Sequence, residues 1–455
     1  MHWLNIHKNP PKIYDLCKKY AIMKYEPLNK ELYILNRKRF AAQMKPNSIA
    51  IFNSNDMMPR NGDCFFPFRQ NSDLFYLSGI DQEETMLAIY PDCVKEGFQE
   101  VLFIKKTNEH IAIWEGHKYT KEEARETSGI QKVIWVEDMS ATINEMILLA
   151  DTVYLNINEN DRYLSELETR DHRYAKMIRD RYPAHSILRA QPIMKRLAMI
   201  KSQYEIDVLQ HCCNITEKAF RRVLDFTKPG VWEYQVEAEI THEFLFNRAN
   251  GHGYTPIIAS GSNACVLHYI DNNQQCKPGD VMLMDFGAEY ANYTADLSRS
   301  IPISGCYTAR QRDVYNAVLN VLKEARNMLR PGTNLTEYHK EVGKVMESEL
   351  IGIGLLDRHE VAKQNPANPL YKKYFMHGTS HHLGLDVHDL MERYGEFQAG
   401  MVFTCEPGIY IREEGLGIRL ENDILVTDGD PIDLMANIPI EADEIEELMN
   451  APVRV

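Results

Sequence analysis

The sequence lacks the marks of a secreted, membrane-spanning or nucleic-acid-binding protein. No apolar run reaches the roughly 18 residues of a membrane helix, and the N-terminus has Pro and Lys where a signal peptide needs its apolar segment. The nine Cys form no CxxC pair, which predicts reduced thiols rather than a disulfide framework. The net charge of −14 argues against nucleic acid or an anionic membrane as a partner. These absences favour a cytoplasmic protein.

The chain is long enough for two domains. With 455 residues, 44% of them hydrophobic and 25% charged, two separate cores are the default for a soluble protein. Strand-like runs rich in β-branched and aromatic residues alternate with helical ones, which predicts an α/β domain over residues 23–190. Residues 1–22 are unlike this segment, and we expect a flexible extension or an upstream start there.

Local signals place several helices. Thr120 and Glu123 have the spacing of a capping box, which predicts a helix ending near Gly129. A charged helical stretch is expected over 161–182, before a proline. Apolar residues at helical spacing predict another helix over 194–228, before Pro229 and Gly230. After residue 190, a helical stretch followed by a strand hairpin with two acids occurs twice. This order hints at an internal repeat within a second domain, over residues 191–455.

The first of these hairpins lies in the stretch 281–298, VMLMDFGAEYANYTADLS. A turn centred after Tyr290 would place Asp285 directly opposite Asp296, with Cβ atoms roughly 4.5–5.5 Å apart. Two carboxylates that close repel each other unless a cation lies between them. Taken alone, this hairpin is equally consistent with a polar sheet edge.

The second hairpin lies in MVFTCEPGIYIREEGLGIRLENDILVT, residues 401–427. A turn centred after Glu413 would place Glu406 opposite Glu421. Arg419 lies two residues before Glu421 and therefore projects from the same strand face. Two acidic pairs within otherwise apolar strands are hard to explain as solvated surface.

Histidine is concentrated in FMHGTSHHLGLDVHDL, just before the second hairpin, at positions 377, 381, 382 and 388. Four carboxylates with an imidazole suit Mn²⁺, Co²⁺ or Zn²⁺ better than a structural zinc site, which favours thiolates. Two divalent ions about 3.5–4 Å apart would neutralise the cluster and make hydroxide available near neutral pH. Hydrolysis follows as the expected chemistry. The zinc-protease pattern HExxH does not supply it, because at His242 the pattern fails with Phe246.

At this point the sequence resembles the pita-bread metallopeptidase family. Its five metal ligands are matched, in order and local context, within MDFGAEYANYTADLSR, HGTSHHLGLDVHD, CEPGIYI and GIRLEND. Within that family the chain resembles the Xaa-Pro aminopeptidases (aminopeptidase P) over almost its whole length. FRQNSDLFYLSGI and IWEGHKYTKEEA are similar to their N-terminal domain. The resemblance implies an α/β (α+β) fold, with a creatinase-like N-terminal domain before a pita-bread catalytic domain of pseudo-two-fold symmetry.

The resemblance also implies roles for the ligands. Asp285 would hold one ion, and His381 with Glu406 the other, while Asp296 and Glu421 would bridge both. Glu406 would in addition shuttle the proton of the attacking hydroxide. The ions are expected to be Mn²⁺, with Co²⁺ or Zn²⁺ as alternatives.

The same resemblance implies how the substrate is bound. His268 would lie near the scissile bond, His388 would donate a hydrogen bond to the substrate carbonyl, and His377 would line the proline pocket. Arg419 would support the histidines, and His382 is expected to be structural. Substrates would be peptides with proline in second place, admitted by a site that the N-terminal domain blocks beyond the first residue. Family members form dimers or tetramers, so a homo-oligomer is expected.

Two other functions remain open from the sequence. A prolidase, restricted to Xaa-Pro dipeptides, shares the ligands and fold, although Ser380 before the histidine ligand favours aminopeptidase P. A metal-free binding module is the second alternative, because this fold does not fix function; such relatives generally lose ligands, and all five are present. A methionine aminopeptidase is disfavoured by the long first domain. The short insertion before GIRLEND leaves the preferred peptide length open.

Overall fold

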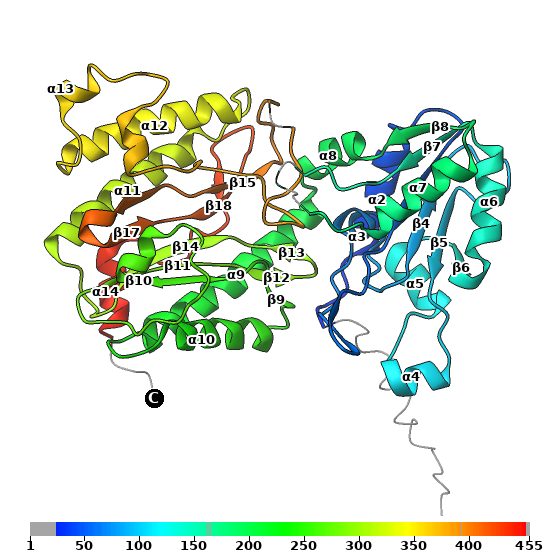
Figure 1. Cartoon of the computed structure of the whole chain (residues 1–455), viewed down its shortest axis with the longest axis horizontal. Coiled ribbons are helices and arrows are strands. Elements are labelled where there is room, and N and C mark those ends of the chain that lie inside the picture. The colour runs from blue at the N-terminus through cyan, green and yellow to red at the C-terminus, as the bar shows by residue number, and fades with distance from the viewer. Residues whose placement is uncertain (1–23, 161, 163–164, 393, 452–455) are drawn as a thin grey trace, which may run out of the picture.

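The structure is a computed structural model that describes residues 24–160, 162, 165–392 and 394–451. The predicted extension over residues 1–22 lies outside them. Figure 1 shows an N-terminal half built on one sheet, set beside a second half in which strands lie between two layers of helices. The predicted boundary near residue 190 falls just before α8 (Gln191–Met199), which packs on α2 (Lys30–Ala41) of the N-terminal half.

The N-terminal half is built on a mixed six-stranded sheet with the order β6-β5-β4-β1-β7-β8. All six residues of its central strand, β1, are buried. Ala50 and Phe52 belong to the core under α2, α3 and α8, whereas Ile49 and Ile51 belong to the core under α6 and α7. Because helices cover both faces, the inner strands β1, β4, β5 and β7 are nearly continuous buried runs. The strands are β1 (Ser48–Asn53), β4 (Met86–Ile89), β5 (Glu100–Ile104), β6 (Lys132–Trp135), β7 (Thr152–Leu155) and β8 (Ser186–Arg189).

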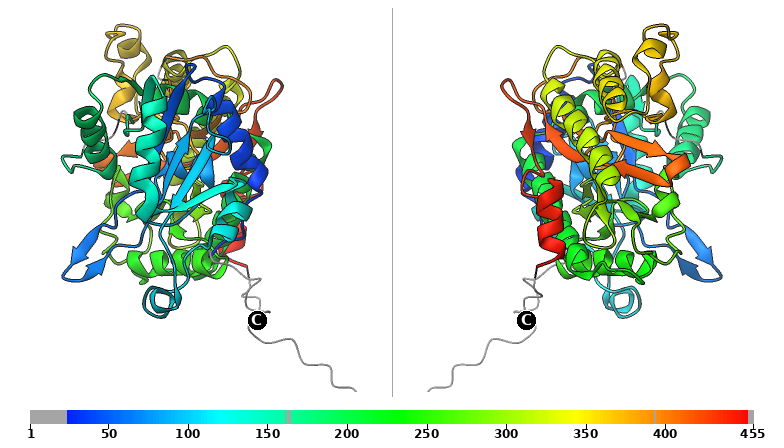
Figure 2. Two further views of the ribbon diagram at one scale, coloured as in Figure 1. Left: turned by 90° about the vertical axis from the view of Figure 1, so that its right-hand side faces the viewer. Right: turned by 90° about the vertical axis from the view of Figure 1, so that its left-hand side faces the viewer.

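Helix ends in this half follow side-chain caps. The capping box at Thr120 and the left-handed Gly129 bound α5, as predicted. The charged helix predicted from residue 161 begins later, because the Thr169 side chain accepts from the His172 N–H and starts α7 there. The remaining helices of the N-terminal half are α3 (Ser72–Ser78), α4 (Glu109–Glu115), α5 (Lys121–Ser128), α6 (Met139–Leu149), α7 (Arg170–Arg181) and η1 (Val136–Asp138). Its remaining strands, β2 (Pro59–Asn61) and β3 (Cys64–Phe65), form a protruding hairpin (Figure 2).

The helical stretch predicted over 194–228 is two helices rather than one. α8 ends at Met199, and Ser202 starts α9 with a capping box, its backbone N–H donating to Glu205 Oε2 at 2.8 Å. Between the helices the Lys201 N–H donates to the Gly400 carbonyl, which a continuous helix would prevent. Hydrophobic periodicity continues through such a break, so the apolar spacing of the sequence did not reveal that there are two helices.

The second half repeats one order of elements, as the sequence hinted. A helix pair, α9 and α10, precedes antiparallel strands, and a second pair, α11 and α12, precedes another antiparallel set. The strands lie between the two pairs (Figure 1). The first set comprises α9 (Gln203–Phe226), α10 (Glu233–Phe246), β9 (Gly251–His252), β10 (Ile257–Ser260), η2 (Gly261–Cys265), β11 (Val281–Phe286), β12 (Ala288–Tyr290), β13 (Tyr293–Thr294) and β14 (Leu297–Pro302). The second comprises α11 (Ala309–Met328), α12 (Leu335–Gly352), α13 (Arg358–Val361), η3 (Leu370–Lys373), β15 (Val402–Cys405), β16 (Gly408–Ile411), η4 (Arg412–Glu414), β17 (Leu416–Arg419), β18 (Asn422–Leu425), β19 (Ile432–Asp433) and α14 (Ala442–Met449).

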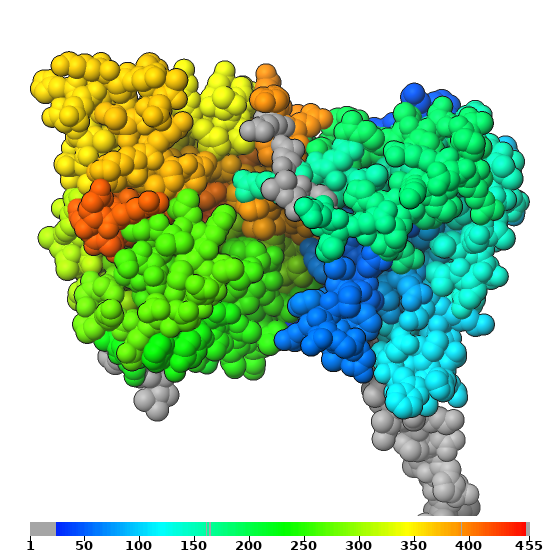
Figure 3. Space-filling view, viewed as in Figure 1, coloured from blue at the N-terminus to red at the C-terminus, as the bar shows by residue number. Residues whose placement is uncertain are grey.

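The two halves lie side by side and contact each other along one flank (Figure 3). The Tyr290 hydroxyl accepts from the Glu26 N–H at 2.9 Å, and Arg69 pairs with Glu289 at 2.9 Å. Across the described ranges, no helix combines the length and apolar character needed to cross a bilayer.

Candidate metal centre and active site

The first acidic hairpin turns one residue later than predicted. Ala291 and Asn292, both at positive φ (50° and 63°), form the turn. β11 therefore pairs Asp285 with Ser298, so the prediction that Asp285 directly opposes Asp296 is wrong. Asp296 lies two residues before Ser298, which makes it a diagonal neighbour on the same face. The two aspartates still converge, because the Tyr254 hydroxyl lies 2.6 Å from Asp285 Oδ1 and 2.5 Å from Asp296 Oδ1.

The second hairpin has the predicted register. One register runs through both strand pairs of this hairpin. Cys405 pairs with Asn422 in β15–β18 on one side of the acids, and Gly408 pairs with Arg419 in β16–β17 on the other. Glu406 consequently faces Glu421, and the turn falls at η4 with Gly415 left-handed. The strands separate around the acids, where the Glu421 N–H donates to the Ser298 carbonyl of the first hairpin at 3.1 Å. This contact brings the two acidic pairs together.

His381 joins the cluster from the loop before β15. Single ligand atoms of Asp296, His381 and Glu421 all lie within 4.8 Å of one another. His381 Nε2 is 3.5 Å from Asp296 Oδ2 and 3.7 Å from Glu406 Oε1. Its Nδ1 lies 3.0 Å from the His382 carbonyl, so the proton belongs on Nδ1 and the Nε2 lone pair faces the carboxylates.

The electrostatics of the cluster call for a cation. Burial raises the pKa of Asp296 well above its ordinary value, and the neighbouring Asp285 raises it further. Burial also raises the pKa of Glu421 well above its ordinary value, with Asp296 as the next contribution, and raises the pKa of Glu406. Among the described residues, no cysteine thiol belongs to the cluster. Clustered carboxylates with one imidazole and no thiolate fit divalent metal ions.

Arg419 links the carboxylates to a histidine. Its Nη2 lies 2.6 Å from Asp285 Oδ2, and its Nη1 donates to the Tyr410 hydroxyl at 3.0 Å. That hydroxyl lies 2.8 Å from His377 Nε2. Arg419 Nε donates to Ser298 Oγ, which in turn donates to Glu421 Oε2 at 2.6 Å. A single guanidinium therefore fixes one group from each acidic pair and, through Tyr410, the predicted proline-pocket histidine.

Three further histidines lie around a pocket of about 450 Å³ that the carboxylates line. His388 lies next to His381, with ring centroids 4.4 Å apart, and burial lowers its pKa to about 3, as it does for His377. Both rings are therefore neutral near pH 7. His268, His377 and His388 all line the pocket, together with Ile257, Leu267, Ile270 and Val387. His382 instead packs on Phe403 at 4.2 Å, as expected of a structural residue.

Two pocket residues had no signal in the sequence. Tyr254 reaches the aspartates because β10 pairs beside β11, and a single sequence does not disclose that pairing. Arg162 enters the pocket lining from the N-terminal half, 123 residues before Asp285, the first predicted ligand. Both depend on long-range packing rather than on a local pattern.

Two acidic strand pairs and a histidine around one pocket define a metallopeptidase of the pita-bread type. The description "Metallopeptidase family M24" matches residues 207–428, and "Aminopeptidase P, N-terminal domain" matches residues 33–154. The chain belongs to the Xaa-Pro aminopeptidases of this metallopeptidase family.

Individual relatives agree. The chain is 32% identical over 439 residues to an Xaa-Pro aminopeptidase of Escherichia coli K12, covering 93% of this chain and 98% of the relative. A Bacillus anthracis structure described as an aminopeptidase P matches with a TM-score of 0.87 and 32% identity, over 94% of this chain and 100% of its own. Zinc-substituted Escherichia coli aminopeptidase P in complex with product matches with a TM-score of 0.82 and 30% identity, over 93% and 99%. The chain is a metallo-aminopeptidase with both parts of the fold that the sequence implied.

Proposed function

We propose that this enzyme removes the first residue from peptides whose second residue is proline, using two divalent ions, most suitably Mn²⁺. The observation that carries the proposal is the pocket itself. It brings four carboxylates and His381 together with the three substrate-side histidines that the resemblance names. Mn²⁺ suits an oxygen-rich donor set, with Co²⁺ or Zn²⁺ as substitutes. When bound, such ions lower the pKa of water and stabilise negative charge on a carbonyl oxygen.

The ligand roles follow the geometry of the free side chains. Asp296 and Glu421 lie at the centre of the cluster with His381, which supports bridging roles for the two acids. Asp285 is held from outside by Arg419, which supports a role on one ion. Glu406 Oε1 lies 3.7 Å from His381 Nε2, which supports a role for these two side chains on the other ion. Because burial raises its pKa, Glu406 is also suited to take up and return a proton.

The histidines would bind the substrate. Neutral His388 would donate its ring N–H to the carbonyl oxygen, and His268 would support the same carbonyl as charge develops. His377, fixed through Tyr410, would line the wall of the proline pocket beside Leu267 and Ile270. A pocket of this kind is needed because a bond to proline has no N–H for the enzyme to bind.

The proposal extends to the setting of the enzyme. We propose a cytoplasmic homo-oligomer, dimer or tetramer, without nucleic-acid or membrane partners, in which the N-terminal domain limits the site to one residue before proline. Light scattering measures the oligomer, and a monomer would remove that part of the proposal.

Peptide length separates this function from its rivals. Chelated protein is reloaded with each metal and assayed on Xaa-Pro, Xaa-Pro-Xaa and longer peptides of up to nine residues. We expect release of the first residue from the tripeptide and longer peptides. Activity confined to the dipeptide would assign the chain to the prolidases, and no activity with any metal would assign a binding role. A peptide with alanine in place of proline is the matched control.

A further inference from the structure

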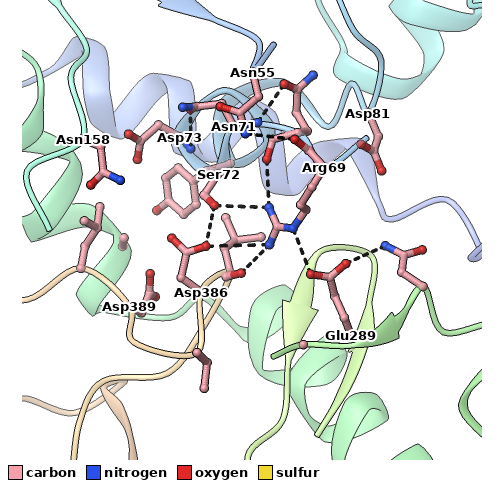
Figure 4. A pocket seen from close by; sticks show the side chains of 18 of the residues that line it. Asn55, Arg69, Asn71, Ser72, Asp73, Asp81, Asn158, Glu289, Asp386 and Asp389 are labelled. Atoms are coloured by element: carbon pink, nitrogen blue, oxygen red, sulfur yellow. Dashed lines mark hydrogen bonds and ion pairs between the residues drawn. The ribbon is translucent and has the colours of Figure 1, made fainter. Parts of the chain in front are cut away.

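One arginine of the N-terminal half contacts two segments of the catalytic half. Arg69 lies between β3 and α3 and points into a pocket of about 660 Å³ between the halves (Figure 4). Of the described residues that line this pocket, Arg69 is the sole Arg or Lys. The acids that line it are Asp73, Asp81, Glu205, Glu289, Asp386 and Asp389.

The first contact is with the turn of the first acidic hairpin. Arg69 Nε donates to Glu289 Oε2 at 2.9 Å, and Nη2 donates to the Asn292 carbonyl at 3.0 Å. Asn292 lies in the left-handed turn, four residues before Asp296. β12 and β13 pair on either side of this turn, and β11 and β14 continue the same register beyond it. The turn is therefore a firm anchor.

The second contact is with the loop that carries His388. Arg69 Nη2 also donates to the Leu385 carbonyl at 2.6 Å, and the Ser72 hydroxyl donates to Asp386 Oδ1 at 2.8 Å. Asn160, also in the N-terminal half, donates its side-chain N–H to the His388 carbonyl at 2.8 Å. Within 383–401 the described residues form no helix or strand, so the loop depends on contacts of this kind to stay in place.

We propose that Arg69 is a positioning residue for catalysis. It ties the His388 loop to the turn of the first acidic hairpin, so that the N-terminal half of the same chain sets the distance between His388 and the carboxylates. The inference rests on the proposed function where it gives His388 a role on the substrate carbonyl. It adds a second task for the N-terminal half, besides limiting access to the site.

The geometry favours positioning over stabilisation. The Arg69 side chain is 31% exposed and that of Glu289 13%, so water still reaches this ion pair, and losing it costs less folding stability than losing a fully buried pair. Its planar guanidinium, however, reaches two carbonyls and a carboxylate of the catalytic half at once, which the single ammonium of lysine cannot reproduce. Displacing a substrate-contacting group by about 1 Å costs up to roughly a hundredfold in rate.

The test compares Arg69→Met and Arg69→Lys with wild type, each full-length and loaded with Mn²⁺, on the Xaa-Pro-Xaa tripeptide. We expect Arg69→Met to lower kcat by about tenfold to a hundredfold, with bound metal and thermal unfolding unchanged, and Arg69→Lys to recover part of the loss. Arg173→Met is the matched control, because Arg173 pairs with Asp56 on the surface of the N-terminal half. A wild-type kcat in Arg69→Met, or a loss explained by lost metal, would overturn the proposal.

A double-mutant cycle tests the route. If Arg69 acts through His388, Arg69→Met should have much less effect in a His388→Ala background than in wild type. Full additivity would overturn the proposal. Should Arg69→Met fail to fold, Asn160→Ala replaces it in the same cycle. Asn160→Ala removes the hydrogen bond to the His388 carbonyl and so releases the same loop from a different contact. If wild type does not cleave the tripeptide, the proposed function fails. The kcat of each variant relative to wild type, measured on the Xaa-Pro dipeptide, then still decides whether Arg69 positions His388.

Discussion

Arg419 and Asp285 form an ion pair that joins the two acidic hairpins, with Nη2 and Oδ2 2.6 Å apart. Arg419 ends β17 of the second hairpin, and Asp285 lies in β11 of the first. The guanidinium is 5% exposed and the carboxylate 16%, so water screens this pair poorly. The protein thus offsets one of the four carboxylates with its own positive charge and leaves the remaining charge for a bound cation.

Replacing Arg419 should therefore affect both stability and catalysis. In Arg419→Met, Asp285 loses its buried partner, and breaking a buried pair costs about 3–5 kcal/mol in the free energy of unfolding. Tyr410 and Ser298 lose the same donor, so kcat should fall as well. Arg419→Lys should restore only part of either loss, because lysine reaches one partner at a time. Urea unfolding and steady-state kinetics measure the two effects. Arg412→Met, in the exposed turn of the same hairpin, is the control, and equal behaviour of the two methionine variants would refute this role.

Asp296→Ala should abolish activity while the N-terminal half stays folded. Asp296 lies in the centre of the cluster, where its ligand atom is within 4.8 Å of those of His381 and Glu421. Without it the proposed bridge between the two ions is lost, and metal analysis should find fewer than two ions per chain. Asp313→Ala removes an exposed acid in α11 and should retain activity and metal. Full activity in Asp296→Ala would show that the two-metal assignment is wrong.

Removing the metal should destabilise the catalytic half as well as inactivate it. Burial and mutual repulsion raise the pKa values of Asp296 and Glu421, which shows that their charged forms are unfavourable without a cation. A ligand present at 100 times its Kd stabilises the folded state by about 2.7 kcal/mol. Chelation should therefore lower the Tm and abolish peptide cleavage, and Mn²⁺ should restore both. Mg²⁺ added at the same concentration tests selectivity. A chelated protein with unchanged Tm and activity would contradict a metal at this site.

The sequence disclosed the second hairpin better than the first for a physical reason. REEG contains Gly415, whose left-handed conformation ends the turn, so the register through Glu406 and Glu421 was predicted correctly. In the first hairpin the two left-handed residues are Ala291 and Asn292, and no glycine marks the turn. The centre was therefore placed one residue early. The prediction that the two aspartates lie close together still holds, because residues that are diagonal neighbours share one face of the hairpin, as directly opposite residues do.

Contacts that depend on long-range packing could not be predicted from the sequence. The ligands could be named because their local contexts resemble those of a known family, which also implied both parts of the fold. Tyr254 lies outside those segments, and its role arises from the pairing of β10 with β11. Arg69 lies within FRQNSDLFYLSGI, which resembles the family's N-terminal domain, but that resemblance did not indicate its contacts with the catalytic half. The break between α8 and α9 was missed because hydrophobic spacing continues across it, although Ser202 and Glu205 carry the capping signal.

A buried acid far from the metal site predicts how stability depends on pH. Asp171, at the start of α7, is 7% exposed, and its Oδ1 accepts one hydrogen bond from Asn53 at 2.7 Å. Burial raises its pKa from 3.8 to about 7, and the nearby Asp73 adds to the shift. The folded state therefore holds a proton between pH 4 and pH 7 that the unfolded state has lost. Stability contributed by this group is present at low pH and is lost as pH rises through about 7.

Asp171→Asn should remove this loss, because the amide keeps an oxygen for Asn53 and cannot ionise. Its Tm should equal that of wild type near pH 4 and exceed it at pH 8, where the gain in the free energy of unfolding is on the order of 2–4 kcal/mol. Taking the difference between variant and wild type at each pH cancels the pH dependence of metal binding, which the two proteins share. Asp180→Asn, an exposed acid on the same helix, should show no pH-dependent difference. A difference for Asp171→Asn that is constant with pH, or that shrinks as pH rises, would mean that Asp171 is already ionised in the folded protein at low pH.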